Sequence, residues 1–310
     1  MPNFLKAPFP YFGGKALIAD TVWKYLGDVK QYIEPFFGSG AVLLRRPPSR
    51  HEICYEIVND KDALLSNVWR AIKYQPAETA KWADWPINHA DLVARRKVLI
   101  ASEQRLISNL TNDDVWCDPK LAGYWIWAAS CWIGSGLTRP NAIPHLTRNQ
   151  GVNSQIPHLA RNKGVNSNLP IQVWFEALAA RLRHVKVVCG DWTRVCGGHW
   201  QAENKPVGLF FDPPYGSLKR KKEIYFHDSF DISAAVEAWV LERGKNPDYR
   251  IVVCGYDDEH ASLQANGWKV RAYKAQGGYG NLGNSQGKVN RHRERLFVSP
   301  HCVTLRELWP

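Results

Sequence analysis

The residues around Asp212 are of the types that bind and orient an amino group. Leu209-Phe-Phe-Asp-Pro-Pro-Tyr215 is an apolar run, typical of a buried strand, that ends in an acid, two prolines and an aromatic residue. Prolines have no N–H, so the chain leaves the sheet there and directs its carbonyls outward. Asp212 and the Pro213 carbonyl can then accept hydrogen bonds from the exocyclic amine of a base, and Tyr215 can stack on it. The alternative is an Asp-Pro-Pro turn that only ends a buried strand.

A second segment combines a strand with closely spaced glycines. Tyr32-Ile-Glu-Pro-Phe-Phe-Gly-Ser-Gly-Ala-Val42 runs from a short strand into Gly38 and Gly40, after which residues 38–44 are predicted to open a helix. Such glycines let the backbone approach an adenosine-type cofactor closely. The segment has neither the GxGxxG pattern nor Gly-Lys-Ser/Thr, which disfavours nucleoside triphosphates.

Two further features fit such a cofactor. Asp60 ends the next predicted strand, where an acid commonly holds ribose hydroxyls; its other possible role is a helix cap. Pro10-Tyr-Phe-Gly-Gly-Lys15 brings the backbone close through its glycines, and Lys15 could pair with a carboxylate. A cofactor with an adenosine and an amino-acid tail would engage all three segments.

The elements that position these segments alternate between strand and helix. Strands are predicted over 31–33, 51–58, 185–189, 207–211, 250–254, 268–273 and 295–298. Helices are predicted after a cap at Asn59-Asp60 and over 92–107, 121–133, 173–183 and 233–242. This pattern indicates an α/β fold with a doubly wound parallel sheet, interrupted by a mainly helical insert. We expect residues 1–75 and 171–310 to form the core and residues 76–170 to form the insert.

The insert contains a short internal repeat. Residues 143–154 recur, with two changes, as residues 156–167. The copies supply donors that suit phosphates and base edges, among them Arg148, Arg161 and Lys163. A solvated loop that tolerated duplication is the alternative, and the same choice applies to the basic run Lys219, Arg220 and Lys221.

The composition narrows the class of protein. The 310 residues include 40 Lys and Arg against 29 Asp and Glu, a net charge of +11 that favours a polyanionic partner, nucleic acid first. The 7 cysteines and 10 histidines lack ligand spacing, so we expect reduced thiols and no metal. No apolar run approaches the roughly 20 residues of a membrane span, and no signal peptide is evident, so a cytoplasmic protein is expected.

In their order along the chain, the Tyr-Phe-Gly-Gly-Lys, Glu-Pro-Phe-Phe-Gly-Ser-Gly and Asp-Pro-Pro-Tyr segments resemble the DNA N6-adenine methyltransferases of the D12 (alpha, GATC-methylase-like) class. The segments 251–260, 275–280 and 293–302 resemble phage and prophage members. The resemblance covers about residues 1–75 and 171–302 and is weaker in the insert. It implies a Rossmann-like methyltransferase sheet, with the insert as target-recognition domain, and S-adenosylmethionine as methyl donor.

The resemblance also implies roles for individual residues. Those expected to contact the methyl donor are Tyr11, Gly14, Lys15, Glu34, Pro35, Phe36, Gly38, Gly40, Asp60, Asp191, Trp192 and Asp212. Among them, Tyr11 and Lys15 would contact the methionine end, Asp60 the ribose, and Asp191-Trp192 would lie near the adenine. The expected catalytic residues are Asp212, Pro213, Pro214 and Tyr215, of which Asp212 and Tyr215 would bind the flipped target base. The segment 135–139 is similar to the family's target-recognition segment, which makes Arg139 a candidate DNA contact.

These observations predict a site-specific enzyme that methylates N6 of a flipped adenine in double-stranded DNA, in the cytoplasm of a bacterium or a phage-infected cell. A flipped base is needed because the amine is inaccessible inside a duplex. The same fold acting on RNA adenine, cytosine N4 or a protein amide is one alternative, and a DNA- and cofactor-binding module without catalysis is another. The oligomeric state is open, with a monomer favoured, and the recognition sequence and the role of the duplicated loop are not predicted.

Overall fold

The computed structural model of the chain describes residues 5–11, 13–51, 54–132, 136–138, 170–197, 204–214, 226–273 and 292–303. Its helices are α1 (Ala19–Leu26), η1 (Leu43–Arg45, a 3-10 turn), α2 (Ala63–Tyr74), α3 (Pro76–Ala83), α4 (His89–Ala101), α5 (Glu103–Asn112), α6 (Pro119–Cys131), α7 (Ile171–Leu182), α8 (Thr193–Cys196), α9 (Phe226–Arg243) and α10 (Ala261–Ala265). Its strands are β1 (Gln31–Glu34), β2 (Tyr55–Asp60), β3 (Val185–Cys189), β4 (Val207–Phe211), β5 (Tyr249–Tyr256), β6 (Lys269–Ala272) and β7 (Glu294–Val298).

The strands form one sheet in the order β3-β2-β1-β4-β5-β7-β6. β1 pairs in parallel with both β2 and β4, and β4 pairs in parallel with β5, whereas β7 runs antiparallel to β5 and β6. The strand order reverses between β1 and β4, and open α/β sheets bind their ligands at the carboxyl ends of strands at such a reversal. The predicted α/β fold with a doubly wound sheet is confirmed.

The chain divides into two compact units. The sheet unit comprises Gly13–Phe37, Ala41–Val58 and Val195–Pro310, and the helical unit comprises Met1–Phe12, Gly38–Gly40 and Asn59–Arg194.

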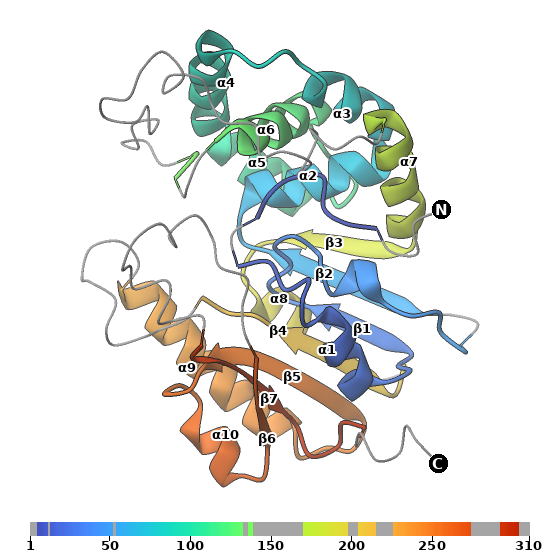
Figure 1. Ribbon diagram of the computed structural model, residues 1–310, viewed down its shortest axis with the longest axis vertical. Helices are drawn as coiled ribbons and strands as arrows, with labels where there is room; N and C mark the ends of the chain where they lie inside the picture. The colour runs from blue at the N-terminus through green and yellow to red at the C-terminus, as the bar shows by residue number, and fades with distance from the viewer. Residues whose placement is uncertain are drawn as a thin grey trace. The chain divides into compact units, whose positions relative to one another are not determined.

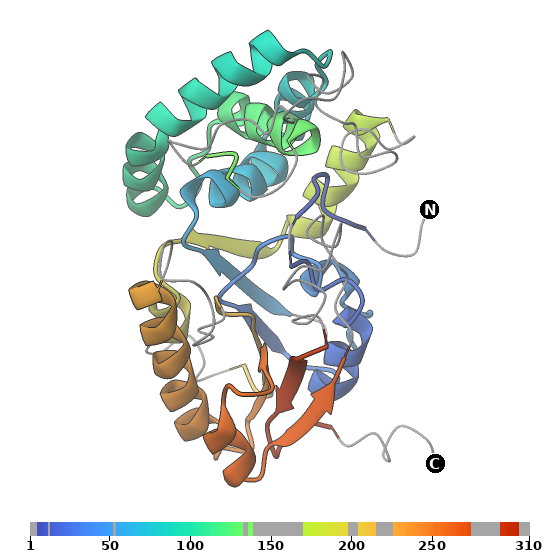
Figure 2. The ribbon, with the colours of Figure 1, turned by 60° about the vertical axis from the view of Figure 1, so that its left-hand side comes forward.

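Within the sheet unit, helices cover both faces of the strands, with α1 on one face and α9 on the other (Figures 1 and 2). Alternate residues of β4 face opposite sides. A Cβ at Gly208 would lie 3.0 Å from a methyl group of Val29 and 3.6 Å from Cδ1 of Leu26, the last residue of α1. The Phe211 ring instead lies 5.6 Å from the ring of Trp239 in α9. β4 is therefore buried on both faces, as expected for a central parallel strand.

The helical unit is built around α6, which packs against α2, α3 and α4. The approach of α6 to α3 depends on Gly123: a Cβ there would lie 2.4 Å from the Cβ of Trp82 and 2.8 Å from the Thr79 carbonyl oxygen. Buried Arg70 of α2 adds polar links, because its Nε donates to the Val187 carbonyl at 3.0 Å and its Nη1 to the Asp113 carbonyl at 2.7 Å.

Several predicted elements differ from those observed. Residues 38–44 do not open a helix, because Gly38 and Gly40 have φ of 51° and 63°, and only η1 follows. The N-cap of α2 is Asp62, whose carboxylate accepts from the backbone N–H of residues 64 and 65, so the cap predicted at Asn59-Asp60 is wrong. The helix predicted over 92–107 is two helices, α4 and α5, which meet at Ser102.

The close contact at Gly123 makes a stability prediction. Gly123→Ala should lower the free energy of unfolding by about 1 to 3 kcal/mol, because the new methyl group must push α6 away from backbone atoms of α3. Helix propensity alone would predict the opposite, a gain of about 1 kcal/mol. Urea unfolding distinguishes the two, with Ser108→Ala on the exposed face of α5 as control, expected within about 0.5 kcal/mol of wild type.

Candidate active site

Asp212 lies at the carboxyl end of β4, in the position that the sequence predicted. The register pairs Phe211 with Val253, so Asp212 is the first residue beyond the ladder between β4 and β5. Pro213 and Pro214 have no N–H with which to continue it. The Asp212 side chain is 22% exposed, and its Oδ1 lies 3.0 Å from Nζ of Lys15.

Lys15 is buried beside Asp212. Its side chain is 9% exposed, its Nζ donates to the Gly13 carbonyl at 3.1 Å, and the same nitrogen lies 3.8 Å from Oε2 of Glu294. Burial alone would lower the pKa of Lys15, but the Asp212 and Glu294 carboxylates outweigh burial and raise the pKa above its ordinary value. The ammonium is therefore charged at any physiological pH. The contact of Lys15 with the methionine end of a donor stays a prediction.

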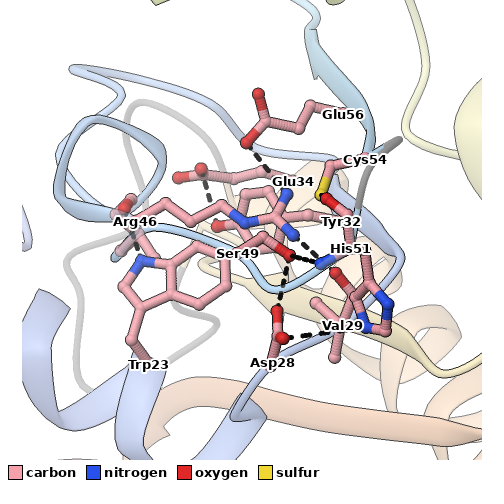
Figure 3. A network of polar contacts seen from close by, with 11 residues as sticks. Trp23, Asp28, Val29, Tyr32, Glu34, Arg46, Ser49, His51, Cys54 and Glu56 are labelled. Atoms are coloured by element: carbon pink, nitrogen blue, oxygen red, sulfur yellow. Dashed lines mark hydrogen bonds and ion pairs between the residues drawn. The ribbon is translucent and has the colours of Figure 1, made fainter.

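Glu34 ends β1 at the same edge of the sheet unit. Its side chain is buried, and its Oε2 accepts a hydrogen bond of 2.8 Å from the Tyr32 hydroxyl (Figure 3). Burial and the Glu34 carboxylate raise the pKa of Tyr32 well above its ordinary value, so the hydroxyl stays a neutral donor. Next along the chain, the Phe36 ring lies 6.4 Å from the ring of Phe211. The end of β1 is thus packed onto the end of β4.

A polar network supports Tyr32 and Glu34 from the neighbouring loop. Figure 3 shows Arg46 at its centre: Nη1 bonds Glu56 Oε1 at 3.0 Å, and the guanidinium lies 5.3 Å from the Trp23 ring centroid. Its Nη2 donates to the Val29 carbonyl at 2.5 Å. Because Glu56 pairs with this fixed cation, a second carboxylate can lie near Tyr32 and Glu34 without remaining uncompensated.

In the helical unit, Gly38 makes a close backbone approach. Its φ of 51° lies in the left-handed region, and a Cβ there would lie 2.9 Å from Cε1 of Tyr11. The Gly38 carbonyl accepts from Trp69 Nε1 at 2.9 Å. Phe9 packs edge-on against Trp69, with 5.6 Å between ring centroids, and lies 6.3 Å from Tyr11. A glycine at position 38 is therefore required by both backbone strain and space.

Asp60 organises the same region. Its Oδ2 accepts from the Gly38 N–H and its Oδ1 from the Asp62 N–H, both at 2.9 Å. Burial and the nearby Asp62 carboxylate raise the pKa of Asp60 to about 6, despite these hydrogen bonds. Hydroxyl groups that donate to this carboxylate would stabilise its charged form.

Asp191 and Trp192 follow β3, as predicted. Asp191 Oδ1 accepts from both the backbone N–H and the hydroxyl of Thr193, which starts α8, and Trp192 is buried. The preceding Gly190 has a φ of 141° and donates its N–H to the Asp60 carbonyl at 3.0 Å. This turn places the end of β3 beside the end of β2 within the helical unit.

Eight of the predicted site residues lie outside the part of the chain that the structure describes. These are Tyr215 of the catalytic segment and the candidate DNA contacts Arg139, Arg148, Arg161, Lys163, Lys219, Arg220 and Lys221. Their roles stay predictions.

The sequence reasoning missed three residues beside Lys15 and Asp212. Tyr273 donates to Glu294 Oε2 at 2.5 Å, and its hydroxyl lies 3.8 Å from Sγ of buried Cys254. A signal was present for Glu294, which is a charged residue at the start of a strand whose last three residues are apolar. Its partner could not be identified without knowing the direction of that strand.

The described residues contain no group of three or more His, Cys, Asp or Glu side chains placed to hold a metal ion. Among the same residues, no helix has the length and apolar character needed to cross a membrane.

Two comparisons with known proteins bear on the family resemblance. Residues 11–112 match the family model of the D12 class N6 adenine-specific DNA methyltransferases. The chain is also similar to a DNA N-6-adenine-methyltransferase of Escherichia phage P1, with 24% identity over 222 residues, which are 70% of this chain and 25% of that protein. The chain thus spans about a quarter of the length of the curated relative that it matches. The resemblance to the D12 class is confirmed.

The raised pKa of Asp60 predicts a pH dependence of stability. The folded chain holds this proton more tightly than the unfolded chain, so the contribution of Asp60 is complete below about pH 4 and is lost as the pH rises through about 6. Between pH 4 and 7 the free energy of unfolding of wild type should therefore fall by about 2 kcal/mol more than that of Asp60→Asn. Urea titrations at both pH values measure this difference, and equal changes in the two proteins would contradict the prediction.

Proposed function

We propose that this chain transfers the methyl group of S-adenosylmethionine to N6 of an adenine flipped out of double-stranded DNA. The observation that carries the proposal is Asp212 at the carboxyl end of β4, held by buried Lys15 and followed by Pro213 and Pro214, in a chain whose residues 11–112 match the D12 class. We also propose residues 76–170 as the target-recognition insert, and the cytoplasm of a bacterium or a phage-infected cell as the place of action.

The residues assigned to the methyl donor carry groups that suit it. In the helical unit, the glycine at position 38 lets the backbone lie directly against the Tyr11 ring, and Asp60 offers an acceptor for ribose hydroxyls that would lower its raised pKa. Asp191 and Trp192, after β3, suit the adenine end. The other residues assigned to the donor are Gly14, Lys15, Glu34, Pro35 and Phe36 of the sheet unit and Gly40 of the helical unit.

Methyl transfer to an amine requires the protein to position the reactants and stabilise charge, and it requires no covalent intermediate with the protein. When bound, the donor supplies an electrophilic methyl group on a sulfonium. An aromatic amine is a poor nucleophile because its lone pair is delocalised into the ring. Asp212 and the Pro213 carbonyl, by accepting its two N–H groups, favour a more tetrahedral nitrogen and stabilise the positive charge that develops there. The amine proton can leave to solvent after transfer, so Asp212 need not act as a strong base.

The proposed acceptor, adenine in double-stranded DNA, is supported by the net charge of the chain and by the residue type at position 212. A net charge of +11 suits the phosphates of double-stranded DNA. An Asp at position 212 favours adenine over cytosine N4, and RNA adenine, cytosine N4 or a protein amide would keep the same fold with another acceptor. A DNA- and cofactor-binding module without catalysis is the alternative outside enzymes.

The first test is methyl transfer by wild type and Asp212→Asn. Purified protein is incubated with labelled S-adenosylmethionine and unmodified duplex DNA, and the nucleosides are separated after digestion. We expect label in N6-methyladenosine and a fall in kcat of about 100-fold or more in Asp212→Asn, because the amide cannot supply the same charge. Asp257→Asn, whose carboxylate pairs with Arg293 at 2.9 Å, is the matched control and should keep wild-type kcat.

Each other result of this experiment changes the assignment. Label in N4-methylcytosine, or transfer only to RNA, keeps the fold and replaces the acceptor. Tight DNA binding without label on any sequence tested favours the binding module.

Donor affinity tests the role of Tyr32. Tyr32→Phe removes the hydrogen bond that fixes Glu34. It should raise the dissociation constant for S-adenosylmethionine about 10-fold while kcat stays within about twofold. Isothermal titration measures the affinity. Tyr25→Phe is the matched control, because it removes another buried hydroxyl of the sheet unit, one that contacts Arg271. Equal affinity of wild type and Tyr32→Phe would contradict this role of Tyr32.

A further inference from the structure

The antiparallel strand β7 brings Glu294 to the edge of the sheet that carries Asp212. Parallel strands β4 and β5 end at this edge, whereas β7 begins there because it runs in the opposite direction. Glu294 pairs with Tyr256, two residues beyond Cys254, and Asp212 follows the pair of Phe211 and Val253. Sequence positions 82 residues apart thus meet at one end of the sheet unit.

Glu294 is held in place from two sides. The Tyr273 hydroxyl donates to its Oε2 at 2.5 Å, and the Tyr273 N–H donates to its backbone carbonyl at 3.3 Å. The same Oε2 faces Lys15 Nζ at 3.8 Å, and the Glu294 side chain is only 13% exposed. The carboxylate therefore has a fixed orientation toward the ammonium.

The Lys15 ammonium is shared between two carboxylates. Its Nζ lies 3.0 Å from Oδ1 of Asp212 and 3.8 Å from Oε2 of Glu294. Burial first, and then the Asp212 and Glu294 carboxylates, raise the pKa of Tyr273, so its hydroxyl is a neutral donor. Burial likewise raises the pKa of Cys254 well above its ordinary value, so the thiol adds no charge.

We propose that Glu294 and Tyr273 are positioning residues for methyl transfer: they hold the Lys15 ammonium between two carboxylates, so that Asp212 keeps both its place and its negative character toward the target amine. This inference rests on the proposed function. An ammonium paired with Asp212 alone would neutralise it more fully, and a neutralised carboxylate is a weaker hydrogen-bond acceptor. Neither residue needs to touch donor or base.

The test separates catalysis from donor binding. Glu294→Gln preserves size and removes the charge, and we expect kcat to fall about 10- to 30-fold while the dissociation constant for S-adenosylmethionine stays within about threefold. Tyr273→Phe should lower kcat by a smaller factor, about three- to tenfold. Glu294→Asp, which restores the charge at a shorter reach, should recover part of the loss.

Glu242→Gln is the matched control. Its carboxylate is 74% exposed on α9 and pairs with Lys245, so the variant should have wild-type kcat. Wild-type kcat in Glu294→Gln, or a loss explained wholly by donor affinity, would overturn the inference. So would an equal loss in Glu242→Gln.

A second readout does not depend on activity. If Glu294 acts on Lys15, Glu294→Gln should lower Tm by a few degrees in wild type and by clearly less in a Lys15→Met background. These four proteins form a double-mutant cycle. If Lys15→Met does not fold, the Tm cycle is measured between Glu294→Gln and Tyr273→Phe instead. Additive shifts would overturn the proposed contact. A wild-type protein that transfers no methyl group would refute the proposed function and the catalytic role with it, whereas the Tm cycle decides the contact separately.

Discussion

The ion pair between Lys15 and Asp212 is the constraint on which the candidate site residues of the sheet unit depend. Placing an ammonium at 9% exposure is unfavourable unless an anion accompanies it, and removing one partner of such a pair costs up to about 3 kcal/mol. The segment before α1 and the segment after β4 are therefore fixed to each other by charge. The cation is contributed by a residue at the start of the chain, and the anion lies directly in the segment that would bind the target base.

Backbone direction then determines which groups can join this pair. The parallel strands deliver Glu34 and Asp212 at their carboxyl ends, whereas the reversed strand β7 delivers Glu294 at its first residue. In the helical unit, Asp60 has the equivalent place at the end of β2 and binds the Gly38 N–H. Strand ends supply the acids, and glycines with positive φ allow the intervening loops to turn close to them.

Much of this arrangement is predictable from the sequence, for physical reasons that differ between residues. Asp212 was predicted because an acid after an apolar run and before two prolines must lie at a strand end. The interrupted helix after Gly38 was not, because apolar periodicity does not report the positive φ that breaks it. Glu294 was missed because its role depends on the direction of β7, which is a property of the whole sheet. The helix boundary at Ser102 also escaped prediction, since α4 and α5 together have one continuous apolar pattern.

The thiol nearest to the ion pair has a consequence for chemical probes of this protein. Cys254 is fully buried between β4 and β7, and burial together with the neighbouring Asp212 raises its pKa well above that of a free thiol. Thiolates, not thiols, react with electrophiles and peroxides. This sulfur is consequently inert toward alkylating reagents and oxidants as long as the sheet is intact, so covalent labelling of Cys254 would report the opening of the strands rather than occupancy of the site.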